Sequence, residues 1–162
     1  MKQEHLQPIP VSAGVITVST TRTRETDTSG NTIQTILSEA NIPVRHYAVI
    51  PDRIDAIRAE LDLALRTCNC IIVDGGTGLT HDDCTIEAVS PLLEKRIDGF
   101  GELFRMKSYE EIGTSMMLSR AVAGTIKGAV VFCIPGSTGA VTLATKSLIV
   151  PEIVHILSHA NR

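Results

Sequence analysis

Apolar residues are arranged along this chain in two patterns that alternate. Short segments rich in apolar and β-branched residues occupy residues 14–19, 44–50, 70–73 and 129–134, and the last two are uninterrupted. Runs of this length that are rich in Val and Ile are typical of buried strands. Between the first two runs, apolar residues recur at helical spacing, at Ile33, Ile36, Leu37 and Ala40. The pattern therefore predicts strands that alternate with helices.

Three further segments carry a helical pattern. They are residues 54–65, 85–95 and 138–160. We expect the last of them to be interrupted near Pro151, because the residue before a proline disfavours the α conformation. Residues 99–124 mix short helical and loop signals, so no single element is predicted there.

The apolar runs are continuous rather than alternating, which is expected of strands that are covered on both faces. Together with the strand–helix order, this predicts an α/β fold, a three-layer α/β/α sandwich with a mainly parallel sheet. At 162 residues the chain suits one domain. We assign that domain to residues 13–162 and expect residues 1–12 to form a flexible N-terminal arm.

In open parallel sheets, ligands bind beyond the carboxyl ends of the strands. The segments that follow the four predicted strands are Ser19-Thr20, Pro51-Asp52, Asp74-Gly75-Gly76-Thr77-Gly78 and Pro135-Gly136-Ser137. All four would meet at one edge of a parallel sheet. That edge is the place to look for a site.

The glycine-rich turn Gly75-Gly76-Thr77-Gly78 lies between a predicted strand and a predicted helix. Successive N–H groups in such a turn can form a nest for an anion, and glycine allows the ligand to approach closely. The alternative is a tight turn without a ligand. The turn is not a P-loop, because no Gly-Lys-Ser/Thr follows, and His81 replaces the last glycine of the dinucleotide-binding pattern. Both interpretations stay open.

Acidic residues accompany these turns. Asp83 or Thr85 could cap the following helix, Asp52 could cap the helix that begins near residue 53, and Asp27 could form an Asx-turn. Alternatively, a carboxylate beside a bound phosphate requires a bridging Mg²⁺ to offset the repulsion. Acids next to an anion nest therefore also fit a magnesium–nucleotide site.

Other polar residues leave alternatives open as well. Glu102 and Arg105 are spaced to pair on a helix, or Arg105 could offer its guanidinium to a phosphate. Ser119 and Arg120 form a similar pair. Pro135-Gly136-Ser137 could donate N–H groups to a second anion or simply turn the chain.

The net charge of −3 argues against a nucleic-acid or anionic membrane partner, each of which requires a basic surface. The first residues lack the apolar core of a secretory signal, and no run approaches 18 consecutive apolar residues. We therefore expect a cytoplasmic protein with reduced cysteines. Cys70, Cys84 and Cys133 lie in or beside apolar runs and are expected in the core.

Several segments, taken together, resemble the MoaB/MogA family, and most of all its MoaB branch. They are residues 74–87, 99–105, 111–124 and 134–137, supported by residues 15–19 and 27–30. Each segment is unremarkable alone, but their order and spacing are specific. The resemblance covers about residues 13–157.

The resemblance implies a MogA-like molybdopterin-binding fold, a homotrimer or homohexamer, and an adenylyltransferase. In that reaction the terminal phosphate of molybdopterin attacks the α-phosphate of Mg-ATP, and the product passes to a molybdate-insertion enzyme. By motif position, Asp52 and Asp83 would be the catalytic acids that hold Mg²⁺. Residues implied to contact molybdopterin or nucleotide are Asp27, Gly75, Gly76, Thr77, Gly78, Thr85, Glu102, Arg105, Ser119, Pro135, Gly136 and Ser137.

One departure from the family is visible: Asp74 stands where the family often has Thr. The extra carboxylate would either contact the metal or weaken the phosphate site. Two alternatives to the adenylyltransferase remain open. One is a non-catalytic carrier or scaffold for molybdopterin, and the other is a competence-damage-type domain that acts on another nucleotide.

Overall fold

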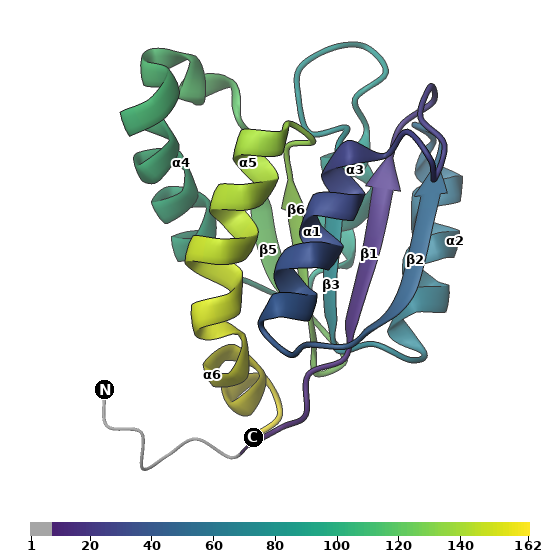
Figure 1. Ribbon diagram of the computed structural model, residues 1–162, viewed down its shortest axis with the longest axis vertical. Helices are drawn as coiled ribbons and strands as arrows, with labels where there is room; N and C mark the ends of the chain where they lie inside the picture. The colour runs from purple at the N-terminus through teal and green to yellow at the C-terminus, as the bar shows by residue number, and fades with distance from the viewer. Residues whose placement is uncertain (1–7) are drawn as a thin grey trace.

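The computed structural model describes residues 8–162 and contains one six-stranded sheet (Figure 1). Along the sheet the strands follow the order β2-β1-β3-β6-β5-β4. The first four in that order run parallel, and β5 is antiparallel to both of its neighbours. Their bounds are β1 Ala13–Val18, β2 Val44–Ile50, β3 Cys70–Asp74, β4 Lys95–Arg96, β5 Val122–Ile126 and β6 Ala129–Ile134.

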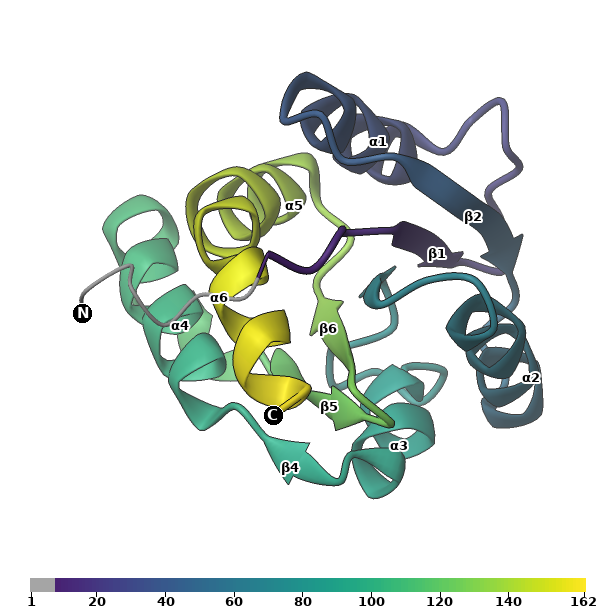
Figure 2. The same ribbon diagram turned by 90° about the horizontal axis from the view of Figure 1, so that it is seen from below.

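Helices cover both faces of the sheet, which gives three layers (Figure 2). One face carries α1 (Thr28–Glu39), α4 (Asp98–Ile112) and the helical stretch made of α5 (Thr138–Thr142), η4 (Leu143–Ile149) and α6 (Val150–Ala160). The other face carries α2 (Ile54–Leu65) and α3 (Thr85–Val89). The expected three-layer α/β sandwich with a mainly parallel sheet is confirmed.

Side chains of the central strands alternate between two cores. Cys70 and Ile72 pack against α1 and the C-terminal helices, whereas Ile71 and Val73 pack against α2 and α3. All four are fully buried. Because a strand alternates its side chains between faces, a continuous apolar run is what a sheet covered on both faces needs.

The hairpin of β5 and β6 was missed by the sequence patterns. Its two strands are joined by Lys127 and Gly128, whose φ angles are 50° and 81°. Two consecutive residues with positive φ make the tight turn that matches strand twist. The segment Val122–Ile126 contains a glycine and a threonine, so its apolar pattern was too weak to predict a strand.

Two predictions about helices that contain a proline are wrong, one because the helix ends earlier and one because it is not interrupted. The helix expected over residues 85–95 ends at Val89, and Pro91 lies in the short 3-10 turn η2 (Ser90–Leu92) that follows. The break expected near Pro151 does not occur. The helix is continuous through Pro151, and the residues before it form the wider π-helical stretch η4, so the hydrogen-bond pattern changes from π to α at the proline.

The helical stretch Thr138–Ala160 is 23 residues long and apolar enough, with a mean hydropathy of 1.5, to meet a length-and-composition test for a membrane span. Core helices meet the same test. Val141, Ile149 and Leu157 from this stretch are fully buried against the sheet. We therefore assign it to the core of the domain.

The loose arm expected over residues 1–12 is wrong for its last residues. Ile9 and Val11 pack against the core, and Asn69 bonds the chain at Pro10 and Ser12. Residues 1–7 lie outside the described residues.

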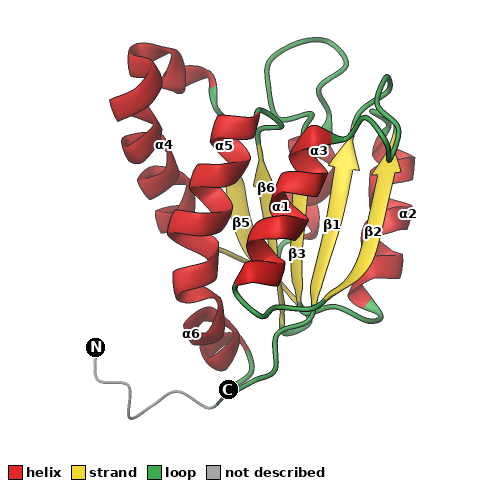
Figure 3. Cartoon of the chain, viewed as in Figure 1, coloured by secondary structure: helices red, strands yellow, loops and turns green. Residues whose placement is uncertain are grey.

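Strand register brings the carboxyl ends of four strands into line. Val18 of β1 pairs with Ile50 of β2, Thr17 with Asp74 of β3, and Asp74 with Ile134 of β6. Figure 3 shows the loops that follow β1, β2 and β3 gathered beyond this edge. The segments predicted to meet there therefore do so.

Candidate functional site

The centre of the edge is the glycine loop, Gly75-Gly76-Thr77-Gly78. Gly75 and Gly76 have φ angles of 95° and 67°, in the region that disfavours side chains. A Cβ on Gly75 would collide with the carbonyl oxygen of Val18, and one on Gly76 with the hydroxyl of Thr85. Glycine is therefore required at both positions by conformation and by space.

Each of the four carbonyl groups of the glycine loop accepts a hydrogen bond from Thr85 or Arg120. Thr85 donates its hydroxyl to the oxygen of Gly75 at 2.8 Å and its N–H to that of Gly76 at 3.0 Å. Arg120 donates Nε to the oxygen of Thr77 at 3.3 Å and Nη2 to that of Gly78 at 2.6 Å. Four successive carbonyls thus have fixed directions.

Fixed carbonyls fix the N–H groups as well. In a planar trans peptide the N–H points opposite to the C=O, and no peptide among the described residues is cis. The N–H groups that follow the four carbonyls belong to Gly76, Thr77, Gly78 and Leu79. Within residues 8–162, nothing accepts a hydrogen bond from any of them. The loop therefore presents unpaired donors, as an anion nest does.

Asp52 and Asp83 border this loop from two different segments. The position of a Cβ on Gly76 lies 3.3 Å from Oδ1 of Asp52, and that on Gly78 lies 2.6 Å from Oδ2 of Asp83. Neither carboxylate caps a helix, so that alternative is wrong for both: the caps of α2 and α3 are Arg53 and Cys84.

Threonine hydroxyls orient both carboxylates. Oδ2 of Asp52 accepts from the hydroxyl of Thr20 at 2.8 Å, and Oδ2 of Asp83 accepts from the hydroxyl of Thr80 at 2.8 Å. No described residue donates a hydrogen bond to either Oδ1. Mg²⁺ takes one or two protein carboxylates and completes its shell with water and phosphate oxygens. The two free carboxylate oxygens beside a nest fit that requirement.

The charges of both acids reach Cys84, which lies between Asp83 and the buried Thr85. Partial burial, followed by the charges of Asp52, Glu87 and Asp83, raises the pKa of the Cys84 thiol. Cys84 is only partly covered, whereas Cys70 and Cys133 are fully buried, as expected, with pKa values raised to about 12.

A second pair of acids, Asp27 and Asp74, lies in the protein below the edge, and both are fully buried. Asp74 accepts hydrogen bonds from Thr17 at 2.8 Å and from Ser29 at 2.6 Å. The hydroxyl of Tyr47 donates to Asp27 at 2.5 Å. Asp27 is also the N-cap of α1 and accepts from Gly30 N at 2.9 Å. The pair therefore ties three strands to the start of a helix.

This environment shifts two pKa values. Burial raises the pKa of Asp74 to about 6, against the lowering effect of the Ser29 and Thr17 hydrogen bonds. Burial and the Asp27 hydrogen bond raise the pKa of Tyr47. Both oxygens of Asp74 are occupied and the side chain is covered. Asp74 thus has no free oxygen for a metal and adds no exposed charge to the glycine loop.

The remaining residues that were predicted to bind substrate differ in how close they lie to the glycine loop. Pro135-Gly136-Ser137 lies against the glycine loop, since a Cβ on Gly136 would be 3.3 Å from the α-carbon of Gly75. Ser137 caps α5 by accepting from Ala140 N. Thr85 is fully buried and anchors the loop from below rather than facing it.

Glu102 and Arg105 are not paired among the ion pairs of the described chain, and Glu102 is exposed. The guanidinium of Arg105 donates instead to the carbonyls of Ser119 and Ala121. Arg105 is therefore occupied within the protein, beside the segment that carries Ser119.

Arg120 is a residue of this site that the sequence patterns left without a definite role. Besides the loop carbonyls it binds Glu87 through two nitrogens, at 2.5 and 3.1 Å. This contact lowers the pKa of Glu87 and raises that of Arg120. Its only signal in the sequence was its place beside Ser119.

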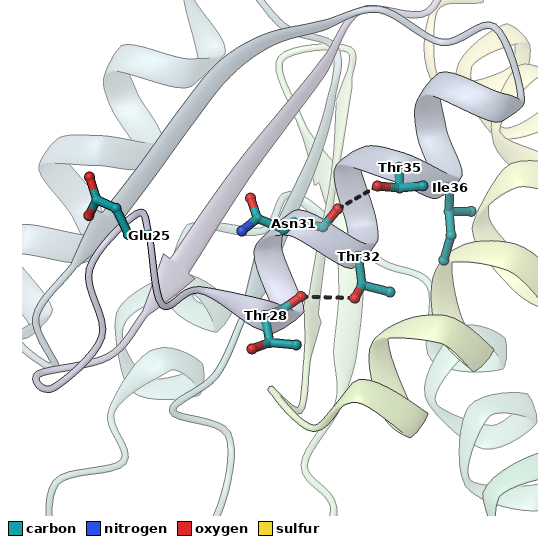
Figure 4. Close-up of a pocket in the computed structure, with 6 residues that line it drawn as sticks. All are labelled: Glu25, Thr28, Asn31, Thr32, Thr35 and Ile36. Carbon is teal, nitrogen blue, oxygen red and sulfur yellow. Dashed lines mark hydrogen bonds between the residues drawn. The ribbon is translucent and has the colours of Figure 1, made fainter.

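A separate shallow groove runs along the outer side of α1 (Figure 4). Its lining includes Thr28, Thr32 and Thr35, and the hydroxyls of Thr32 and Thr35 donate to carbonyls of their own helix. These hydroxyls are thus occupied within the helix, and the glycine loop remains the better candidate site.

Comparison with known sequences places the chain among proteins of one pathway. The family described as "Probable molybdopterin binding domain" matches residues 14–155. The chain is 50% identical over 151 residues to molybdenum cofactor biosynthesis protein B of Staphylococcus carnosus, which covers 91% of this chain and 89% of that protein. It is 47% identical over 164 residues to the protein of the same name from Bacillus cereus, over 98% and 97% of the two chains.

Solved structures agree. A crystal structure of molybdenum cofactor biosynthesis protein B has a TM-score of 0.91 at 47% identity, covering 96% of this chain and 99% of that one. The tungsten cofactor synthesizing protein MoaB from Pyrococcus furiosus has a TM-score of 0.87 at 38% identity, covering 96% and 100%. CinA from Thermoplasma acidophilum, at 19% identity, a TM-score of 0.60 and coverage of 90% and 97%, shares the fold alone.

Proposed function

Because the chain belongs to the molybdopterin-binding domain family of molybdenum cofactor biosynthesis proteins, we propose that it is a molybdopterin adenylyltransferase. Its part in molybdenum cofactor biosynthesis follows from the family. In the proposed reaction an oxygen of the molybdopterin phosphate attacks the α-phosphorus of ATP. A phosphoanhydride bond forms, the bond to the β-phosphate breaks, and pyrophosphate leaves.

One observation carries the proposal: unpaired N–H groups of the glycine loop lie beside two carboxylates that each keep one free oxygen. The N–H groups would hold phosphate oxygens, and the turn Pro135-Gly136-Ser137 lies next to them. Asp52 and Asp83 would hold Mg²⁺, which neutralises charge on the transferring phosphate. Phosphoryl-type transfer needs positioning and charge stabilisation rather than a covalent nucleophile.

The proposal is tested by pyrophosphate release with purified chain, molybdopterin and Mg-ATP. We expect release that requires both substrates, and Asp83→Asn should lower its rate at least about tenfold because the cation loses one of two charged ligands. Asp82→Asn is the matched control, since Asp82 is adjacent in sequence but its side chain is almost fully exposed. An unchanged rate in Asp83→Asn would remove Asp83 from the mechanism.

The same assay separates the alternatives. Molybdopterin binding without pyrophosphate release, and without any response to ATP, would identify a carrier or scaffold. Release of product from another nucleotide in the absence of molybdopterin would favour the competence-damage-type activity. The buried Asp74, whose two oxygens accept hydrogen bonds from Thr17 and Ser29, is compatible with a phosphate at the loop in either the enzyme or the carrier.

We also propose that the chain acts in the cytoplasm as a trimer or hexamer and passes its product to a molybdate-insertion enzyme. Exposed apolar side chains on α4 and the following turn η3 (Gly113–Leu118) support an assembled state, namely Met106, Tyr109, Ile112, Met117 and Leu118. Sedimentation equilibrium would measure the state, and a monomer at micromolar concentration would contradict it.

A further inference from the structure

Two arginines connect α4 to the glycine loop through the backbone between them. Arg105 lies on α4, and its Nη1 donates to the carbonyl oxygens of Ala121 at 3.0 Å and Ser119 at 3.5 Å. These carbonyls lie on either side of Arg120 in the chain. Arg105 therefore holds the backbone from which the second arginine projects.

The Arg105 side chain passes over Gly101, one turn earlier in the helix, where a larger residue would block it. A Cβ on Gly101 would stand 2.6 Å from Nη2 of Arg105 and 2.8 Å from the carbonyl oxygen of Ala121. Both contacts are closer than a real Cβ makes. Gly101 thus leaves the space through which Arg105 reaches the segment, which accounts for a glycine inside α4 despite its cost to a helix.

Arg120 then holds half of the glycine loop. Its guanidinium bonds the oxygens of Thr77 and Gly78, and Glu87 grips two of its nitrogens from the other side. The N–H groups opposite those carbonyls belong to Gly78 and Leu79. Among the described residues, only Thr85 donates to the carbonyls opposite the N–H groups of Gly76 and Thr77.

We propose that Arg105 and Arg120 are positioning residues that act in series to aim the N–H groups of Gly78 and Leu79 at the bound phosphate. Neither arginine contacts the substrate. Gly78 has no side chain to restrict its peptide groups, so without Arg120 those peptides are free to rotate and turn their donors away. The inference rests on the proposed function only for the identity of the anion.

The division of the loop between Thr85 and Arg120 provides the test. Variants Arg120→Gln, Arg120→Lys and Arg105→Gln are compared with the wild-type chain by ¹⁵N relaxation and by titration with inorganic pyrophosphate. Arg58→Gln is the matched control, because Arg58 also donates to carbonyls, those of Ala88 and Glu87, but not to the glycine loop. If Arg105→Gln does not fold, Arg105→Lys takes its place.

In Arg120→Gln we expect lower order parameters at the amides of Gly78 and Leu79, with those of Gly76 and Thr77 retained. Pyrophosphate binding should weaken about tenfold, which corresponds to about one charge-assisted hydrogen bond. Arg105→Gln should act in the same direction but less. Lysine keeps the charge without the planar fork, so Arg120→Lys should not restore binding.

Three results would overturn the inference: unchanged order at Gly78 and Leu79, equal loosening of all four amides, or full recovery of binding in Arg120→Lys, which would assign the effect to charge. The wild-type chain could bind no pyrophosphate while Arg120→Gln still lowers the order parameters of Gly78 and Leu79 alone. In that case the positioning role of the arginines is supported and the proposed phosphate site is contradicted. The two proposals are thus separable.

Discussion

Four carboxylates gather near one edge of this sheet, and they form two contrasting pairs. Asp27 and Asp74 are fully buried, and their oxygens accept hydrogen bonds from the protein. Asp52 and Asp83 are partly exposed, and each keeps one oxygen that accepts no hydrogen bond from residues 8–162. The same residue type therefore joins elements together in one pair and remains available to a ligand in the other.

Asp74 and Asp83 each accept two hydrogen bonds, but Asp74 accepts one on each oxygen, whereas Asp83 accepts both on Oδ2. The contrast shows that burial and the distribution of donors over the two oxygens, rather than the number of donors, decide what a carboxylate can do. Buried charges must be matched by hydrogen bonds inside the protein, which leaves nothing for a cation. A carboxylate at the surface needs only enough contact to fix its direction, and one threonine supplies that to each of Asp52 and Asp83.

The largest expected effect on stability is at the buried pair. Asp27→Ala removes the N-cap of α1 and the charged acceptor of the Tyr47 hydroxyl. A charge-assisted buried hydrogen bond contributes about 2 to 3 kcal/mol and a cap about 1 kcal/mol, so we expect a loss of between about 3 and 4 kcal/mol. Urea unfolding measures it. Asp82→Ala should change the free energy of unfolding by less than about 0.5 kcal/mol, and similar losses in both variants would remove the contrast.

A pH dependence follows from Asp74. Its pKa is raised from 3.8 to about 6 in the folded chain, so the folded state holds a proton that the unfolded state releases. Asp74 therefore adds stability that is fully present below about pH 4 and is lost as the pH rises through 6. At 1.36 kcal/mol per unit this loss is about 3 kcal/mol.

Asp74→Asn should remove that slope. The difference in unfolding free energy between the variant and the wild-type chain, measured from pH 4 to 7, should shift in favour of the variant as the pH rises. A constant difference across this range would mean that Asp74 titrates normally when folded.

The smallest expected effect concerns Asp52, one of the two partly exposed carboxylates, and the stabilisation of the chain by Mg-ATP. Mg-ATP at about a hundred times its Kd should stabilise the wild-type chain by about 2.7 kcal/mol, by mass action. Asp52→Asn should lose most of this gain while its ligand-free melting temperature stays near that of the wild-type chain. A large drop in melting temperature without ligand would place Asp52 with the structural acids. ATP without Mg²⁺ is the control.

Much of the architecture was readable from local pattern. The segments at residues 14–19, 44–50, 70–73 and 129–134 all became strands. Three of them form the buried strands β1, β3 and β6, as Val- and Ile-rich runs covered on both faces should, whereas residues 44–50 include Arg45 and His46 and form the half-buried edge strand β2. The hairpin strand at Val122–Ile126 was not predicted, since a glycine and a threonine weaken its pattern and its pairing with β6 is what makes it a strand. Pro151 did not break its helix; the helix continues through it, with π-helical turns directly before the proline.

The three-layer fold, the edge at which the site lies and the residue types gathered there could be read from local pattern along the chain. The roles of these residues became clear from the folded chain. Folding buried Asp74 and left Asp83 accessible, and it turned Arg105 toward a neighbouring backbone rather than toward a ligand. Spacing along the chain reports which face or strand end a residue occupies. Burial and hydrogen-bond partners depend on segments far apart in the chain, such as Thr17 and Asp74, which are 57 residues apart, and a local pattern does not report those contacts.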